Sequence, residues 1–283
     1  MFANLSDAVS RQGNSQRLTI RHLGRMKAEG RKITMLTAYD YTFASIVDQA
    51  GVDVVLVGDS LGMVMLGYDS TLPVTMEDVL HHTRAVARGT QRALVVADMP
   101  FGSYQASVED AMRNAARFLK EAQAHAIKLE GGQSVLPQVR ALTAAGIPVM
   151  GHLGLTPQSV HQMGGYRVQG RSDAQAQQIL QDARALEEAG AFGIVAECMP
   201  HELGSEMAKA VGIPVIGIGA GAGCDGQVLV LQDMLGLYKD ISPRFVKRYA
   251  DLHGATSIAI KSYVDEVRSG AFPTLEHSFT AST

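Results

Sequence analysis

The chain of 283 residues contains no tryptophan, and aromatic residues make up only 6% of it. Proteins that bind single-stranded nucleic acid commonly stack bases on aromatic side chains, so a base-stacking surface is not expected. The 25 lysine and arginine residues face 28 aspartate and glutamate residues, which gives a net charge of −3, and basic residues form no run. This composition argues against nucleic acid or an anionic membrane surface as a partner.

Cysteine is also scarce. Cys198 and Cys224 are too few for a disulfide scaffold, and no paired Cys-x-x-Cys motifs indicate a zinc site. No stretch approaches the roughly 20 apolar residues that span a bilayer. Residues 1–17 are polar and lack the apolar segment of a secretory signal, so we predict a poorly ordered extension, with a transit peptide as the alternative. A globular protein of the cytoplasm is therefore expected.

Short apolar runs alternate with helical patterns along the rest of the chain. Runs of Val, Ile, Leu and Ala without polar alternation are typical of strands buried on both faces of a parallel sheet. Such runs occupy Ile33–Ala38, Val54–Val57, Ala93–Ala97, Ala126–Leu129, Ile147–Met150, Ile194–Ala196 and Pro214–Ile218, with a weaker eighth at Val228–Leu231.

The helical patterns between these runs have their own start and stop signals. Ser107 and Ser172 stand where N-caps are expected, and the Ala-Gly pairs that end at Gly51, Gly146 and Gly190 are typical helix ends. A last helix is predicted over Arg244–Arg268. No Gly-x-Gly-x-x-Gly fingerprint follows the first strand, so we predict one (β/α)₈ TIM barrel over residues 18–283, rather than a doubly wound sheet.

Ionisable residues follow six successive runs. A single acid after a strand is commonly a helix cap, but the carboxyl ends of barrel strands converge on one mouth, where active sites are built. Six such positions on one rim therefore indicate an active site. They are Asp40, Asp59, Asp98, Lys128 with Glu130, His152, and Glu197.

Several carboxylates in one pocket would raise one another's pKa values unless a cation accompanies them. Lys128 supplies one positive charge, and a divalent ion would supply the rest. Hard oxygen ligands favour Mg²⁺ over Zn²⁺. Asp59 and Asp98 are the expected ligands, with Glu130 bound directly or through water. The alternative is a metal-free salt-bridge network around Lys128.

Several short segments spread over nearly the whole chain are specific in sequence. They are 37–41 (TAYDY), 57–63 (VGDSLGM), 69–75 (DSTLPVT), 98–101 (DMPF), 128–132 (KLEGG), 151–160 (GHLGLTPQSV), 164–171 (GGYRVQGR), 197–198 (EC), 213–221 (IPVIGIGAG) and 276–279 (EHSF). Through these segments the chain from Leu18 to Phe279 resembles the ketopantoate hydroxymethyltransferase family, with the motifs in family order.

The resemblance implies a (β/α)₈ barrel of the phosphoenolpyruvate/pyruvate-type superfamily that depends on Mg²⁺ and usually assembles as a homodecamer. It implies transfer of a hydroxymethyl group from 5,10-methylenetetrahydrofolate to 3-methyl-2-oxobutanoate through a Mg²⁺-stabilised enolate. The product, 2-dehydropantoate, leads to pantothenate and coenzyme A.

The family's site residues carry over onto matching positions of this chain. Asp59, Asp98 and Glu130 match the residues at the metal, and Glu197 matches the general base. The positions that bind the 2-oxo acid correspond to Asp59, Ser60, Asp98 and Lys128. His152 follows the fifth strand, and we expect it to orient the acids or contact the substrate; a structural histidine in a turn is the alternative.

Other candidates are weaker. Adjacent residues do not share a helical face, so His81 and His82 are not expected to bind metal. Cys198 is interpreted as a small buried residue and not as a nucleophile. The glycines of 217–223 could bind phosphate or allow close backbone packing, and the loop 62–75 could cover the pocket or contact another subunit.

Two other functional classes remain open from the sequence. One is a relative with the same enolate chemistry, such as a carbon–carbon lyase or a phosphonopyruvate-type mutase, although the Lys-Lys-Cys-Gly-type loop of those enzymes is absent here. The other is a non-catalytic ligand-binding barrel, which we would expect to lack at least one of Asp59, Asp98, Lys128 and Glu197.

Overall fold

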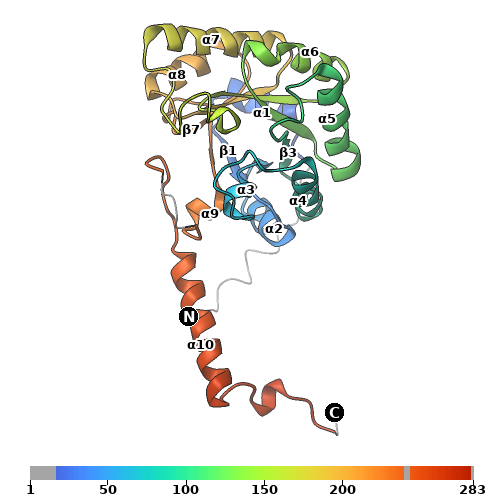
Figure 1. Cartoon of the computed structure of the whole chain (residues 1–283), viewed down its shortest axis with the longest axis vertical. Helices are drawn as coiled ribbons and strands as arrows, with labels where there is room; N and C mark the ends of the chain where they lie inside the picture. The colour runs from blue at the N-terminus through green and yellow to red at the C-terminus, as the bar shows by residue number, and fades with distance from the viewer. Residues whose placement is uncertain (1–16, 239–242, 282–283) are drawn as a thin grey trace. The chain divides into compact units, whose positions relative to one another are not determined.

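A computed structural model describes residues 17–238 and 243–281 of the chain (Figure 1). The chain divides into two compact units, one that ends at Val230 and one that begins at Leu231. Residues 1–16 of the predicted N-terminal extension lie outside the described residues. The assignment of residues 18–283 to a single domain stays a prediction.

The first unit is a closed barrel of parallel strands, in which each strand pairs with the next and the last pairs with the first. This confirms the predicted (β/α)₈ fold. The strands are β1 (Ile33–Thr37), β2 (Val54–Val57), β3 (Leu94–Asp98), β4 (Ala126–Glu130), β5 (Val149–Gly154), β6 (Gly193–Glu197), β7 (Val215–Ile218) and β8 (Gly226–Leu229).

Burial on both faces explains why most strands read as continuous apolar runs. Every residue of β2, β3, β4 and β7 is buried. The outer face of such a barrel is covered by helices and its interior is filled by side chains, so neither face of these four strands meets water. Figure 1 shows helices α4 to α8 arranged around the strands.

The boundaries of β5 differ most from the prediction, because it begins two residues after Ile147 and ends four residues after Met150, and the eighth strand is also displaced. β8 begins and ends two residues before the predicted run, because Leu231 already belongs to the short helix α9 (Leu231–Met234). Gly226 begins this strand beside β1, where an added Cβ would lie 2.4 Å from the Ile33 carbonyl oxygen. A residue without a side chain is therefore needed where β8 closes the barrel.

Polar caps begin several helices, as predicted. The Ser107 hydroxyl accepts the N–H of Asp110 at 3.0 Å, and the Ser172 hydroxyl accepts that of Gln175 at 3.4 Å. The helices of this unit are α1 (Ile20–Ala28), α2 (Tyr41–Gln49), α3 (Leu61–Val64), α4 (Met76–Gly89), α5 (Val108–Ala122), α6 (Leu136–Ala144), α7 (Asp173–Glu188) and α8 (His201–Ala210), with single 3₁₀ turns η2 (Gln133–Val135) and η3 (Pro157–Ser159).

The second unit contains α9, the long helix α10 (Leu252–Ser269) and the 3₁₀ turn η4 (Leu275–His277). The prediction that this helix begins at Arg244 is wrong. Asp251 caps α10 by accepting the N–H of Gly254 at 3.1 Å, so the helix starts eight residues later than predicted. Across the described ranges, none of the helices combines the length and the apolar character needed to cross a membrane.

A buried carboxylate fixes the chain that leads into β3. Asp48 of α2 accepts the backbone N–H groups of Gln91, Arg92 and Ala93 at 2.7–3.1 Å. These donors precede the strand, so their partner lies on another element and not in the barrel ladder. Asp48 thereby connects α2 to the start of the strand that ends at Asp98.

We expect Asp48→Ala to lower the free energy of unfolding by about 3 kcal/mol, because part-buried N–H groups would lose their acceptor. Urea unfolding at fixed protein concentration measures this change. Gln49→Ala, at the exposed neighbouring position, is the control and should change stability by less than about 0.5 kcal/mol. Equal stability of the two variants would contradict the assigned role of Asp48.

Candidate active site

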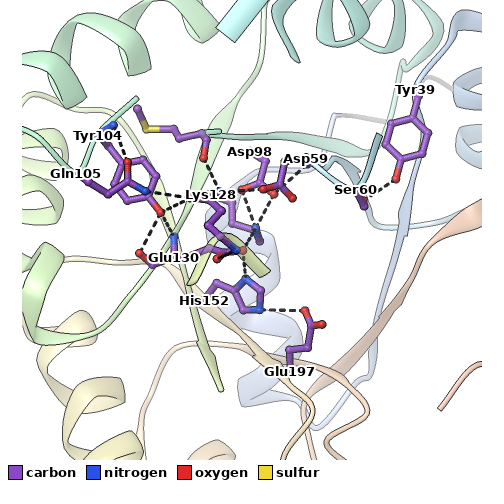
Figure 2. A network of polar contacts seen from close by, with 12 residues as sticks. Tyr39, Asp59, Ser60, Asp98, Tyr104, Gln105, Lys128, Glu130, His152 and Glu197 are labelled. Atoms are coloured by element: carbon purple, nitrogen blue, oxygen red, sulfur yellow. Dashed lines mark hydrogen bonds and ion pairs between the residues drawn. The ribbon is translucent and has the colours of Figure 1, made fainter. Parts of the chain in front are cut away.

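The acids and bases predicted at the strand ends meet inside the barrel mouth (Figure 2). Strand register explains the order in which they meet, because Asp98 of β3 lies opposite Lys128 of β4, and Glu130 of β4 lies opposite His152 of β5. Lys128 and Glu130 are two residues apart on one strand, so both side chains point to the same face.

A lysine and an aspartate form the closest pair of the site. The Lys128 ammonium donates to both carboxylate oxygens of Asp98 at 2.6 Å. The backbone N–H of Asp59 also donates to Asp98, at 3.2 Å, which joins the residues at the ends of β2 and β3. All three side chains are buried, so their charges interact with little screening by water.

His152 lies between two carboxyl groups. Its Nδ1 is 3.2 Å from Oε1 of Glu130, and its Nε2 is 3.1 Å from Oε2 of Glu197. Figure 2 shows this row running from Glu130 through the imidazole to Glu197. Glu197 is the most open of the three, with 16% of its side chain exposed. His152 thus lies within β5 and not in a turn, and its role in orienting the acids or contacting the substrate stays a prediction.

The two aspartates are held in an environment that disfavours their charge. Burial raises the pKa of Asp59 well above its ordinary value, and the charges of Asp98 and Glu130 raise it further. Burial also raises the pKa of Asp98, although the Lys128 charge opposes this effect. Their ionised forms therefore need positive charge nearby.

The basic groups respond in the opposite direction. Burial by itself would lower the pKa of Lys128, but the charges of Asp98, Glu130 and Asp59 outweigh burial and raise it. Burial and the Lys128 charge would lower the pKa of His152, but the contacts with Glu130 and Glu197 raise it to about 9. Burial alone would raise the pKa of Glu130, yet His152 and Lys128 lower it. The imidazole is thus a cation at neutral pH.

Not every predicted rim residue belongs to this cluster. Asp40 caps α2 by accepting the N–H of Phe43 at 2.8 Å, as single acids after strands commonly do. Ser60 lies beside Asp59, and its hydroxyl is 2.8 Å from that of the buried Tyr39 (Figure 2). Tyr39 therefore fixes where the Ser60 hydroxyl lies.

Two buried polar residues in the site were not predicted as site residues. Gln158 of η3 donates from Nε2 to Asp59 at 2.9 Å, and its backbone N–H donates to Glu130 at 3.0 Å. The Tyr104 hydroxyl accepts the backbone N–H of Glu130 at 3.0 Å and donates to Gln158. Both residues lie in loops after strands, where neither periodicity nor charge distinguishes them from solvent-exposed polar residues.

The weaker candidates have structural explanations. Cβ atoms added at Gly221 and Gly223 would lie 2.4 Å and 2.6 Å from the Cβ atoms of His201 and Ser205 on α8, so close packing explains these glycines. His82 is 2.6 Å from the Tyr39 carbonyl oxygen through Nδ1. Burial and Glu197 raise the pKa of the Cys198 thiol to about 12, which disfavours the thiolate that a nucleophile needs.

The described residues do not by themselves complete a metal site. Within residues 17–238 and 243–281, no group of three or more His, Cys, Asp or Glu side chains is arranged so that it could hold a metal ion. Any ion in the mouth would therefore take part of its ligands from water or substrate.

A closed parallel barrel with buried acids and bases at the carboxyl ends of its strands is the architecture of a TIM-barrel enzyme. A model of the ketopantoate hydroxymethyltransferase family matches residues 17–275. The chain therefore belongs to the ketopantoate hydroxymethyltransferase family, and it is a transferase.

Two similar proteins that share one name match nearly the full chain. The 3-methyl-2-oxobutanoate hydroxymethyltransferase of Syntrophus aciditrophicus (strain SB) is 59% identical over 271 residues, which cover 96% of this chain and 100% of that protein. The protein of that name from Moorella thermoacetica (strain ATCC 39073 / JCM 9320) is 59% identical over 263 residues, which cover 93% of this chain and 98% of that protein.

Solved structures with little sequence identity share the fold. Phosphonopyruvate hydrolase in complex with oxalate and Mg++ superposes with a TM-score of 0.58 at 16% identity, covering 92% of this chain and 93% of its own. 2,3-Dimethylmalate lyase, a PEP mutase/isocitrate lyase superfamily member, has a TM-score of 0.56 at 15% identity, with 93% and 92% coverage. These likenesses show the same barrel fold, and the superfamily stays a prediction.

Gly154 controls how closely Glu197 approaches β5. It has a φ of +93°, and an added Cβ would lie 2.2 Å from the Glu197 carbonyl oxygen. We expect Gly154→Ala to displace Glu197 and to lower the kcat of hydroxymethyl transfer about 100-fold, as displacements of about 1 Å can do.

Gly146→Ala is the matched control, because Gly146 has a similar φ of +83° but no atom within 4 Å of an added Cβ. It separates backbone strain from displacement of Glu197. If steady-state kinetics give the same fall in kcat for both variants, displacement of Glu197 does not explain the loss of activity.

Proposed function

We propose that the chain transfers a hydroxymethyl group from 5,10-methylenetetrahydrofolate to 3-methyl-2-oxobutanoate and so forms 2-dehydropantoate. The buried row that joins Asp98 to Lys128, and Glu130 through His152 to Glu197, carries this proposal. Such a row supplies what the reaction needs, namely positive charge for the keto acid and a carboxylate that can accept a proton.

The donor set fits Mg²⁺. Among the described residues, four carboxyl groups in or beside the mouth face Lys128 and His152 as cations, which leaves an excess of negative charge that a divalent ion would balance. The raised pKa values of Asp59 and Asp98 indicate the same need. Asp59 and Asp98 would hold the ion, with Glu130 reaching it through water, since carboxylate oxygens are the ligands that Mg²⁺ prefers and the described residues offer no set of three direct ligands.

A bound Mg²⁺ would supply Lewis-acid polarisation of the 2-oxo group, which makes the neighbouring C3–H bond more acidic. Asp59, Ser60, Asp98 and Lys128 form the keto-acid site in this proposal. Lys128 is charged at neutral pH, so its ammonium stabilises negative charge that develops on the substrate oxygens. Its contact with Asp98 holds the ammonium in place before the substrate arrives.

Glu197 removes the proton from C3. It is the most exposed of the acids in the row, so it can reach a substrate, and the contact with His152 fixes its carboxyl group. His152 contacts Glu130 on the other side and so couples the base to the end of the site that binds the keto acid.

The bonds balance as follows. The C3–H bond breaks, its proton passes to Glu197, and its electron pair forms a carbon–carbon bond to the one-carbon unit of the folate. Both carbon–nitrogen bonds that join the one-carbon unit to the folate break. Water supplies the hydroxyl group of the product, and the two folate nitrogens take up the proton from C3, released by Glu197, and the remaining proton of the water. No oxidant or reductant is required.

Deuterium exchange at C3 of 3-methyl-2-oxobutanoate, measured by NMR with Mg²⁺ and without folate, tests the first step. We expect the wild type to exchange deuterium and to lose this exchange after chelation. The exchange rate of Glu197→Gln should be lower than that of the wild type by a factor of about 100 or more, because the general base is removed.

Glu202→Gln is the control, because Glu202 is an exposed acid that contacts His201 and lies outside the row. Its exchange rate should match that of the wild type. Normal exchange by Glu197→Gln would remove Glu197 as the base, and exchange that survives chelation would remove the metal.

We also propose that the reaction takes place in the cytoplasm. Cys198 and Cys224 are both free thiols, a state that a reducing compartment maintains.

A homo-oligomer, and specifically a decamer, is proposed as the working assembly. Helix α10 contains no buried residue. One face of this helix carries apolar side chains at helical spacing, namely Ile260, Tyr263 and Val267. These three side chains and the nearby Ile258 are 46–70% exposed. An apolar face of this kind supports burial against a second copy of the chain.

We expect the wild type to sediment with about ten times the mass of the 30.2 kDa chain. Ile260→Asp should sediment with a lower mass, because its carboxylate would be buried in the contact between two copies of α10. Ser262→Asp, at an exposed position away from this face, is the control and should keep the wild-type mass. A monomeric wild type in analytical ultracentrifugation would rule out the assembly.

A further inference from the structure

The Gln158 side chain uses its full hydrogen-bonding capacity among the acids. The amide is buried, and its Nε2 donates to Oδ2 of Asp59 at 2.9 Å and to the Met99 carbonyl oxygen at 3.0 Å. Its Oε1 accepts from the Tyr104 hydroxyl at 2.8 Å and from Nε2 of Gln105 at 3.1 Å. Two hydrogens and two lone pairs are the capacity of a primary amide.

These partners also dictate which way the amide faces. If the amide were rotated by half a turn, its oxygen would face the Asp59 carboxylate and the Met99 carbonyl, which are both acceptors. The NH₂ group would then meet the Gln105 NH₂ group, which is a donor. Only the observed orientation pairs donors with acceptors, so an N–H is held toward Asp59.

Gln158 contacts a second carboxyl group through its backbone. Its N–H donates to Oε2 of Glu130 at 3.0 Å, while the Tyr104 hydroxyl accepts the Glu130 N–H at 3.0 Å. The 3₁₀ turn η3, which comes after β5, therefore contacts both Asp59, which follows β2, and Glu130, which ends β4. Neither Gln158 contact depends on the solvent, because the residues involved are buried.

We propose that Gln158 is a positioning residue, which holds the Asp59 carboxylate, and with it Glu130, in the orientation that binds the metal ion and the keto acid. This inference rests on the proposed function. Without the N–H from Gln158, the buried carboxylate would lose the hydrogen bond that fixes its rotation, and partners of this kind tune metal affinity.

Gln158→Met tests the proposal, because methionine is similar in size but cannot donate a hydrogen bond. Gln138→Met is the matched control. Gln138 is also a buried glutamine, and it contacts the same neighbour, since its Nε2 donates to the Tyr104 carbonyl oxygen at 3.2 Å, but that bond ends on a backbone carbonyl and not on a carboxylate.

The measurement is a titration of the full chain with Mn²⁺, with the free ion followed by electron paramagnetic resonance. We expect Gln158→Met to bind Mn²⁺ about 10- to 100-fold more weakly than the wild type and Gln138→Met to bind within about threefold of it. The KM for the keto acid should rise in Gln158→Met, while the KM for the folate stays near the wild-type value.

Circular dichroism of both variants checks that the barrel is intact. If Gln158→Met does not fold, Tyr104→Phe replaces it, since it removes the hydroxyl that donates to Oε1 of Gln158 and accepts the Glu130 N–H. A fall of about 5- to 30-fold in Mn²⁺ affinity is expected from these two lost hydrogen bonds. Unchanged Mn²⁺ affinity in the folded variant would overturn the role of Gln158 alone. A wild type that binds no Mn²⁺ would overturn it together with the proposed metal.

Discussion

The burial of several carboxyl groups at one end of the barrel is the constraint on which the rest of the site depends. A carboxylate taken out of water loses hydration that only nearby positive charge or donated hydrogen bonds can replace. Lys128 supplies both to Asp98, with two contacts at 2.6 Å. His152, with its pKa raised to about 9, supplies positive charge between Glu130 and Glu197. Each acid thus has a partner that the fold holds in place.

Strand register turns this constraint into an ordered row. Because neighbouring strands pair in parallel, Asp98 meets Lys128 and Glu130 meets His152 at matched positions, and Gly154 lies opposite Glu197 one strand further. Negative and positive side chains therefore alternate along the row from Asp98 to Glu197, although the carboxyl groups outnumber the two cations. The same order separates the proposed keto-acid site, near Asp98 and Lys128, from the proposed base at the other end of the row.

The barrel alone does not define the reaction. Structures at 13–16% identity share this architecture and have the names of hydrolases, lyases and mutases. The acids and bases of this chain lie at its strand ends and in the first residues of the loops that follow them. There, close approaches such as that of Gly154 to the Glu197 carbonyl and contacts such as that of Gln158 with Asp59 set the position of each acid.

The sequence by itself determined the barrel and most of the cluster, because fully buried strands leave continuous apolar runs and the acids stand directly after them. Val54–Val57 was predicted to the residue, and Asp98, Lys128, Glu130 and His152 all lie where β3, β4 and β5 end. Only the tertiary structure decided which of these residues touch. It assigned Asp40 to a helix cap, started α10 at Leu252, and brought Gln158 and Tyr104 to the acids. Hydrogen bonds between loops far apart in the chain leave no periodic pattern, so periodicity and charge along the sequence do not reveal them.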